Sequence, residues 1–236
     1  MEEISSRYDL HIGSSHMITV VGGTKGGSGK STVATNLAIM LAAAGRDVLL
    51  VDADDQETST DFTNLREATR PGGAGYTCVA LTGPAVRTGV QRLAPKHAHV
   101  IIDTGGRDTV SQRAALSVCQ TYLVPFAPRS FDVWTLDKVA GLVDEARAVN
   151  PSLRALAFIN RADARGNENA EAAELIRTKP ALEFVPAALG TRKAYANAAA
   201  SGLAVTELRP QDPKASEEIA ALFGYLFDIP AISNRH

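Results

Sequence analysis

An α/β fold, with a mostly parallel sheet and helices on both of its faces, is predicted by three features of the sequence. From Met17 onward, short apolar segments alternate with helical segments, as in chains built from β-α-β units. The apolar segments are nearly continuous, which favours central parallel strands that are covered on both faces. The first of them runs directly into a glycine-rich segment, Gly22–Gly29, and a helical pattern follows at once.

The individual elements follow from apolar periodicity and from capping residues. The first strand is predicted over Met17–Gly22, and an amphipathic helix over Ser31–Ala44 with Gly45 as its C-terminal cap. The last helix is predicted to begin after the capping residue Asp212, with Pro213 in its first turn. Its apolar stripe consists of Ile219, Leu222, Phe223 and Leu226. The other predicted strands are Asp47–Val51, His99–Ile102, Thr121–Pro125, Ala155–Ile159 and Phe184–Ala187.

Length and composition fit one folded domain and argue against several other classes of protein. The 236 residues are 45% hydrophobic and 21% charged, which is ordinary for a globular domain. The longest apolar run, Leu37–Ala44, is far shorter than the roughly 20 residues that span a bilayer. The chain does not open with a recognisable secretory signal, so a cytoplasmic location is expected. Cys78 and Cys119 have neither metal-ligand nor CxxC spacing, and both are expected to be buried, reduced thiols.

The polar segment Met1–His16 is predicted to be a disordered leader or a tail of cloning origin, and the folded domain is predicted over residues 17–236. The whole chain has a formal net charge of −2, and the leader contributes three acidic residues and one basic residue. The remainder is therefore formally neutral. Any binding of nucleic acid would have to depend on a local basic patch.

The segment Gly22–Thr32 has the composition of a phosphate-binding loop. Glycines allow backbone N–H groups to surround phosphate oxygens, and the N-terminus of the following helix adds positive potential. Lys30 would neutralise the outer phosphates, and Ser31 would coordinate Mg²⁺. The predicted cradle consists of Gly26, Gly27, Ser28, Gly29, Lys30, Ser31 and Thr32.

A dinucleotide-binding loop is the nearest alternative, because Asp52 and Asp54 follow about where a ribose-binding acid would lie. Lys30 and Ser31 directly after Gly29 argue against it. The loop also departs from the ordinary Walker A pattern, since Thr24 stands where glycine is usual. Instead, Lys25 opens the pattern Lys-Gly-Gly-x-Gly-Lys-Ser/Thr.

With this deviant Walker A motif the chain resembles the ParA/MinD family of P-loop NTPases, over nearly all of residues 17–236. The resemblance implies ATP and Mg²⁺ as cofactors and a homodimer with ATP at its interface. In such a dimer Lys25 would reach across to the partner's phosphates and act, with Lys30, as a catalytic cation. Dimerisation should then depend on the γ-phosphate.

Acidic residues at two predicted strand ends extend the resemblance. Val51–Gln56 is similar to the family's Val-Asp-x-Asp-Pro-Gln sequence, with Asp55 in place of the usual proline. By resemblance, Asp54 is the catalytic residue that positions the attacking water, and Asp52 lies near the metal. Asp103, which ends the apolar segment His99–Ile102, would hold Mg²⁺ through a water, as a Walker B acid does. The alternative is that these acids simply form solvated strand ends.

Two further segments are interpreted by the same resemblance. Asn160 stands where an asparagine pairs with the adenine edge, and Pro186 with the backbone after it would close the other side of the base. An ordinary turn is the alternative for Asn160. Thr104-Gly105-Gly106 resembles a flexible switch after the Walker B acid, although many relatives have prolines there.

The resemblance is in particular to the small ParA partition ATPases that lack an N-terminal helix-turn-helix domain. It implies an ATP-bound dimer that binds nonspecific DNA and associates with the nucleoid. A small ParB-like adaptor would stimulate hydrolysis and so position a plasmid, chromosome or other cargo. Arg192 and Lys193, at the start of a late helix, are the predicted DNA contacts. A solvated helix start is the alternative interpretation.

Two other uses of the same fold remain as alternatives. A MinD-like ATPase linked to membranes would need a basic, amphipathic C-terminal tail, and residues 229–236 offer only Arg235, so no membrane partner is expected. A metabolic or redox enzyme, such as a dethiobiotin synthetase or a nitrogenase-type iron protein, is the other. Cys78 and Cys119 do not match the cluster motifs of that iron protein, and no further substrate constellation stands out.

Overall fold

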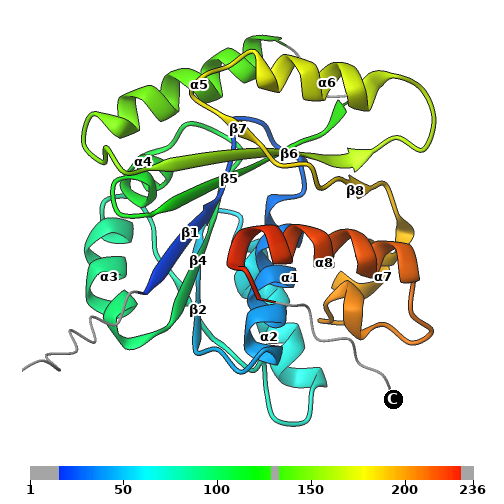
Figure 1. Ribbon diagram of the computed structural model, residues 1–236. Coiled ribbons are helices and arrows are strands. Elements are labelled where there is room, and N and C mark those ends of the chain that lie inside the picture. Colours follow the sequence, from blue (N-terminus) through cyan, green and yellow to red (C-terminus); the bar gives the residue numbers. More distant parts are fainter. Residues whose placement is uncertain (1–15, 129–132, 230–236) are drawn as a thin grey trace, which may run out of the picture.

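The computed structural model describes residues 16–128 and 133–229, which form a parallel sheet between two layers of helices (Figure 1). The strands pair in the order β3-β2-β4-β1-β5-β6-β7, and β8 pairs with β6. Each of these pairings is parallel. The α/β fold with a mostly parallel sheet is therefore confirmed.

The strands are β1 (Met17–Val21), β2 (Val48–Ala53), β3 (Thr77–Ala80), β4 (His99–Thr104), β5 (Thr121–Phe126), β6 (Arg154–Ala162), β7 (Glu183–Phe184) and β8 (Leu189–Gly190). The α-helices are α1 (Lys30–Ala43), α2 (Thr58–Thr69), α3 (Ala85–Leu93), α4 (Val110–Leu116), α5 (Val133–Arg147), α6 (Glu168–Arg177), α7 (Lys193–Ala199) and α8 (Pro213–Phe227). Two short 3-10 helices are η1 (Ala94–Lys96) and η3 (Val205–Glu207).

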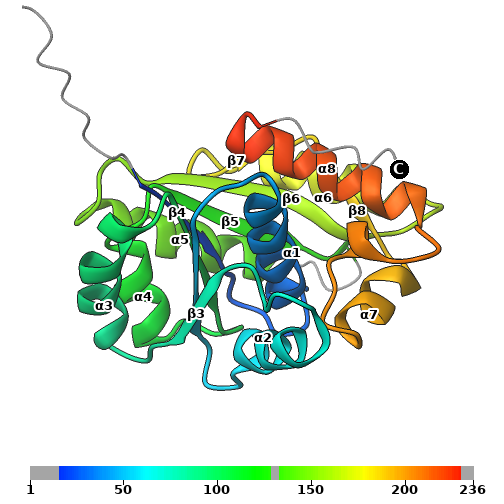
Figure 2. The ribbon, with the colours of Figure 1, turned by 90° about the horizontal axis from the view of Figure 1, so that it is seen from below.

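Both faces of the sheet are buried, which explains the continuous apolar strands. Helices α3 to α6 cover one face, and α1, α7 and α8 cover the other (Figure 1 and Figure 2). In β1, Val20 belongs to the first core and its neighbour Val21 to the second. Because successive side chains of a strand point to opposite faces, such a strand must be apolar at every position.

Helix α1 was predicted to be amphipathic, and this expectation is wrong. The consecutive residues Val33 to Leu41 are all buried, so the burial extends around the whole helix. The reason is that α1 packs against the sheet through β1, β2 and β4 and is also contacted by α2 and α8. A helix covered on all sides needs no polar face.

Other sequence predictions agree with the structure except at edges. The Asp212 side chain caps α8 by accepting a 3.0 Å hydrogen bond from the Ala215 amide. Strand β3 was missed because its four residues are only partly buried at the sheet edge. Of the predicted strand Phe184–Ala187, only Phe184 lies in a strand, β7, and β8 begins later, at Leu189.

The remaining sequence expectations have mixed outcomes. Cys119 is buried as expected, whereas Cys78, on the edge strand β3, is only half-buried; both thiols are free. The predicted leader, except for His16, lies outside the described residues. Within the described ranges, no helix is long and apolar enough to cross a membrane.

The strand order places β1 between β4 and β5. The chain goes from β1 through α1 to β2 on one side, and from β4 through α4 to β5 on the other. In open α/β sheets, the crevice at the carboxyl ends of the strands where the winding changes direction is where ligands bind. The glycine-rich segment follows β1 at this point.

Helix α2 is held at its N-terminal end by two acids at neighbouring strand ends. The Ser59 hydroxyl donates a 2.7 Å hydrogen bond to Asp103 Oδ2, and the Thr60 amide donates a 2.8 Å bond to Asp52 Oδ2. These bonds fix the first turn of α2 beside the carboxyl ends of β2 and β4.

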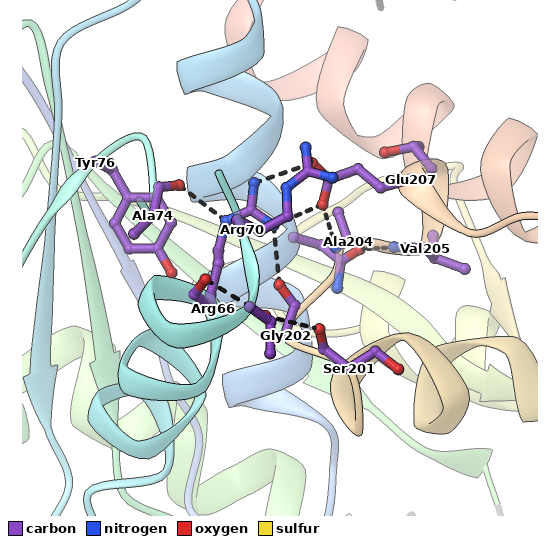
Figure 3. A network of polar contacts seen from close by, with 12 residues as sticks. Arg66, Arg70, Ala74, Tyr76, Ser201, Gly202, Ala204, Val205 and Glu207 are labelled. Atoms are coloured by element: carbon purple, nitrogen blue, oxygen red, sulfur yellow. Dashed lines mark hydrogen bonds and ion pairs between the residues drawn. The ribbon is translucent and has the colours of Figure 1, made fainter. Parts of the chain in front are cut away.

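At its C-terminal end α2 is joined to the segment 201–207 by a buried polar network (Figure 3). Arg66 is 5% exposed and makes two hydrogen bonds to Glu207, at 2.7 and 2.9 Å. It also donates to the carbonyl oxygens of Ala74 and Gly202. Glu207 in turn accepts a 2.9 Å hydrogen bond from the Ala204 amide. This network fastens the segment that follows α7 to α2.

Candidate nucleotide site

The glycine-rich segment forms a tight turn between β1 and α1. Gly27 and Gly29 have φ of +73° and +88°, in the left-handed region that glycine adopts without steric cost. Gly29 is also closely packed, because a Cβ atom there would lie 2.4 Å from Nδ2 of Asn160. Backbone geometry therefore requires glycine at the positions that the phosphate-loop interpretation singled out.

Lys30, the first residue of α1, lies over this turn. Its side chain is buried, and Nζ donates a 3.1 Å hydrogen bond to the carbonyl oxygen of Lys25. Burial lowers the pKa of Lys30, and the negative charges of Asp103 and Asp54 counteract part of that shift. A bound polyanion would stabilise the charged ammonium further.

Asp52 and Asp103 lie side by side at the carboxyl ends of β2 and β4, where the parallel register pairs them. Both are buried, at 1% and 0% exposure. Burial raises the pKa of Asp103 to about 7, and the charge of Asp52 adds to the effect. The hydroxyls of Ser31 and Ser59 and the charge of Lys30 act in the opposite direction.

The two oxygens of the Asp103 carboxylate differ in their hydrogen bonding. Oδ2 accepts the hydrogen bond from Ser59, whereas Oδ1 is buried and has no hydrogen-bond partner. An unsatisfied buried oxygen is costly, and a cation or an ordered water would satisfy it. Together with the Ser31 hydroxyl on the adjoining cleft, it offers the oxygen donors that Mg²⁺ prefers.

The described residues contain no cluster of three or more His, Cys, Asp or Glu side chains that could hold a metal ion. Mg²⁺ usually keeps several waters and binds through one or two carboxylates together with substrate phosphates. The residues present therefore fit a magnesium ion that arrives with a nucleotide, not a permanent all-protein metal site.

The loops after β2 and β4 close on the glycine-rich turn. Asp54 is half-buried, and its Oδ1 accepts a 3.2 Å hydrogen bond from the Gln56 amide. A Cβ at Gly105 would lie 3.1 Å from Asp54 Oδ1, and one at Gly106 would lie 2.6 Å from the Gly26 backbone. The two glycines after Asp103 thus permit close approach between these loops. The prolines common in relatives are replaced here by residues without side chains.

A cleft of about 730 Å³ opens above the turn and α1. It brings together most of the predicted phosphate cradle, the acid Asp54 and the Gly105-Gly106 segment. Asp55, which replaces the family's proline, is exposed and also lines the cleft. Lys25 is half-buried and lines a separate small cavity beside β5 and α5.

A second cavity, of about 380 Å³, adjoins this cleft and has the more apolar lining that a nucleoside needs. Its walls come from the start of α1, the end of β6, the segment Leu189–Arg192, and α7 with Tyr195. Pro186 is exposed and is not part of this lining, whereas the backbone after it lines the cavity from Leu189 onward. After β7, the chain first lies beside the cavity at β8.

Asn160 lines the second cavity, but its amide is already engaged. Nδ2 donates a 2.6 Å hydrogen bond to the Ser28 carbonyl oxygen, and Oδ1 accepts a 3.0 Å bond from the Arg161 amide. In this state Asn160 braces the glycine-rich turn. Because Nδ2 has a second N–H and Oδ1 a second lone pair, the predicted contact with adenine does not require either bond to break.

The predicted DNA contacts differ in their surroundings. Arg192 is at the N-cap position of α7, and its guanidinium forms a bidentate ion pair with Glu218 of α8. It faces the second cavity. Lys193, the first residue of α7, is exposed. The structure therefore leaves Lys193 better placed than Arg192 for a contact with phosphates.

Sequence reasoning missed Arg161 and Tyr195, which both line the second cavity. Arg161 directly follows Asn160. Tyr195 lies two residues after Lys193, in the helix start for which the sequence suggested only DNA binding. Their proximity results from the packing of α7 beside β6 and β8, which no local pattern reveals.

Comparison with known proteins agrees with this geometry. A family model described as the CobQ/CobB/MinD/ParA nucleotide binding domain matches residues 19–205. Maintenance of carboxysome distribution protein A of Halothiobacillus neapolitanus is 26% identical over 200 residues, covering 84% of this chain and 91% of that protein. Protein IncC of Escherichia coli is 27% identical over 273 residues, covering 98% of this chain and 75% of that protein.

A solved structure shows the same fold. The ATP complex of a variant McdA protein of Cyanothece superposes with a TM-score of 0.74 at 18% identity, and the match covers 94% of this chain and 100% of that one. A parallel sheet with a deviant phosphate loop after its first strand defines a P-loop ATPase. The chain belongs to the ParA/MinD family of ATPases, and the resemblance seen in the sequence is confirmed.

Proposed function

We propose that this chain is an ATP-driven positioning protein, which dimerises on Mg-ATP, binds nonspecific DNA as a dimer, and is released when a partner stimulates hydrolysis. The observation that carries the proposal is that Lys30 and Asp54 line one cleft beside a deviant phosphate loop, with Asp103 buried close enough for its charge to act on Lys30. The name of one similar protein, which refers to maintenance of carboxysome distribution, agrees with a role in distributing cargo.

Hydrolysis in this cleft would depend on positioning. The β- and γ-phosphates would lie along the turn Gly26–Lys30, where backbone N–H groups and the Lys30 ammonium balance their charge. Asp54, on the cleft wall, would orient the attacking water. Bound Mg²⁺ would offset the charge that develops on the phosphates, held by Ser31 and, through water, by Asp52 and Asp103.

Dimerisation would use the outer edge of the same turn. Gly26 and Gly27 are exposed, and Lys25 precedes them with its carbonyl oxygen bonded to Lys30. Nucleotide binding would draw Lys30 toward phosphate and away from the Lys25 carbonyl. Lys25 could then reorient toward the nucleotide of a second copy, so that ATP becomes part of the interface.

DNA binding would use the exposed side of α7. Lys193 of each protomer is accessible, and a dimer would double the number of phosphate contacts. Arg192 could take part only by leaving Glu218, which makes it the weaker of the two predicted contacts. Because phosphate contacts dominate such binding, no sequence preference is expected.

Retention on duplex DNA tests this proposal. The parent should bind in the presence of Mg-ATP and not with ADP, and Lys193→Glu should weaken the binding to all duplexes alike. Because the dimer loses one lysine–phosphate interaction from each protomer, the slope of log affinity against log salt should become shallower by about 1.8, which is about 0.9 per contact. Lys96→Glu is the matched control, because Lys96 is exposed on η1, before β4 and at the opposite end of the strands. If the parent shows no ATP-dependent binding, the DNA-linked function is wrong.

A further inference from the structure

We infer that Arg161 is a nucleotide-binding residue, whose guanidinium contacts the phosphate group nearest the sugar. The inference deepens the proposed function, because it rests on ATP occupying the cleft and the adjoining cavity. It assigns a role to a side chain that the phosphate-loop motif does not include.

The first observation is the backbone of Arg161. Its φ of +54° lies in the left-handed region, which residues other than glycine, asparagine and aspartate seldom adopt. It stands at the irregularity in the β6–β8 pairing between Asn160 and Ala162. Such a conformation persists where the surroundings enforce it, and it is often found at ligand sites.

The surroundings do enforce it here. The Arg161 amide donates a 3.0 Å hydrogen bond to Asn160 Oδ1, and its carbonyl oxygen accepts a 3.0 Å bond from the Thr191 hydroxyl. Asn160 is itself bonded to the Ser28 carbonyl oxygen of the glycine-rich turn. The Arg161 backbone is therefore positioned directly relative to the turn that would hold the phosphates.

The second observation is where the side chain lies. The 730 Å³ cleft and the 380 Å³ cavity have three lining residues in common, namely Gly29, Thr32 and Arg161. A nucleotide with its outer phosphates in the cleft and its nucleoside in the cavity must pass between Arg161 and the first turn of α1. The group that makes this passage is the phosphate attached to the sugar.

The third observation is electrostatic. The Arg161 side chain is exposed, and among residues 16–128 and 133–229 it forms no hydrogen bond or ion pair. By contrast, Arg192, which lines the same cavity, is neutralised by Glu218. Arg161 thus leaves its planar donor fork available for an anion, and phosphate is the anion that matches this fork.

The substitution Arg161→Gly separates the side chain from the backbone. Glycine adopts the left-handed conformation freely, so the thermal midpoint of the nucleotide-free protein should stay the same or rise. Affinity for Mg-ATP, measured by calorimetry, should fall by about 10- to 100-fold, as expected for loss of a hydrogen bond between charged groups. Arg161→Asn, which also tolerates the conformation, should behave in the same way.

Arg165→Ala is the matched control, because Arg165 is an exposed arginine four positions further along the chain and lines neither the cleft nor the cavity. It should bind Mg-ATP as the parent does. Magnesium tripolyphosphate is the second probe. Its affinity should also fall in Arg161→Gly if the guanidinium contacts phosphate, and an unchanged affinity would overturn the assignment.

Two different results separate the role of Arg161 from the proposed nucleotide site. If the parent and Arg165→Ala bind Mg-ATP and both Arg161 variants bind it equally tightly, Arg161 is not a nucleotide-binding residue. If the parent itself does not bind Mg-ATP, the proposed nucleotide site is wrong and the inference falls with it.

Discussion

Arg66 and Glu207, which are 141 residues apart in the sequence, form a bidentate ion pair that joins α2 to the segment after α7 (Figure 3). The Arg66 side chain is 6% exposed and that of Glu207 is 18% exposed. Because the carbonyl oxygens of Ala74 and Gly202 accept two further hydrogen bonds from Arg66, four of its five guanidinium N–H groups have partners. This pair holds together two parts of the chain that contribute to different walls of the nucleotide site.

Removal of Glu207 should therefore destabilise the protein strongly. Glu207→Ala leaves Arg66 buried without its counter-ion, which should cost about 3–5 kcal/mol of the free energy of unfolding. Arg70 also contacts Glu207, at 3.1 Å, but its side chain is 42% exposed. Arg70→Ala should consequently cost less than about 1 kcal/mol. Urea unfolding of the three proteins checks the difference, and equal destabilisation of the two variants would refute it.

The same pair should make stability depend on pH. Burial alone would raise the pKa of Glu207, but the hydrogen bonds from Arg66 and the Ala204 amide and the charges of Arg66 and Arg70 outweigh it, so the pKa lies below 4.5. A group whose pKa is lowered by folding contributes stability above its unfolded pKa and loses it as the pH falls through the folded one.

The measurement compares the parent with Glu207→Gln, which cannot titrate at this position. The difference in free energy of unfolding should be constant near neutral pH and should shrink as the pH falls below 4.5 toward the lowered pKa. A difference that grows on acidification would contradict the assignment of the pKa shift to this pair.

Asn160 should support the glycine-rich turn. Asn160→Ala removes the donor to the Ser28 carbonyl oxygen and the acceptor for the Arg161 amide, so both partners lose a hydrogen bond. The expected result is a loss of about 1–3 kcal/mol in stability and weaker binding of Mg-ATP. Asn169→Ala is the control, because Asn169 makes two equivalent bonds to Asp163 outside the turn. It should lose stability but keep the affinity for Mg-ATP.

The phosphate loop and the acids at the strand ends could be predicted from the sequence because their signals are local. Gly27 and Gly29 both have left-handed backbone angles and Gly29 is also closely packed, and Asp52 and Asp103 each lie at the end of an apolar strand. Parallel strands bring such ends to one edge of the sheet. A pattern read along a single segment is sufficient for these features.

The nucleoside cavity could not be predicted in the same way. Its walls meet only because β8 pairs with β6 and α7 packs behind it, which brings Tyr195 toward α1. The sequence prediction named Pro186, which lies just before the segment Leu189–Arg192 that lines the cavity. The Arg66–Glu207 pair has no local signal at all, since each residue alone resembles an ordinary charged helix residue.

Light scattering of ATP-loaded variants tests the central claim most directly, namely that ATP is shared between two copies of the chain. The parent should dimerise with ATP and not with ADP. Lys25→Ala should bind Mg-ATP but remain monomeric, because Lys30 still serves the local phosphates. Asp54→Ala should accumulate as a dimer, because the hydrolysis that dissolves the dimer is slowed. If Lys25→Ala dimerises like the parent, or if both variants remain monomeric with ATP, the shared-nucleotide dimer is contradicted.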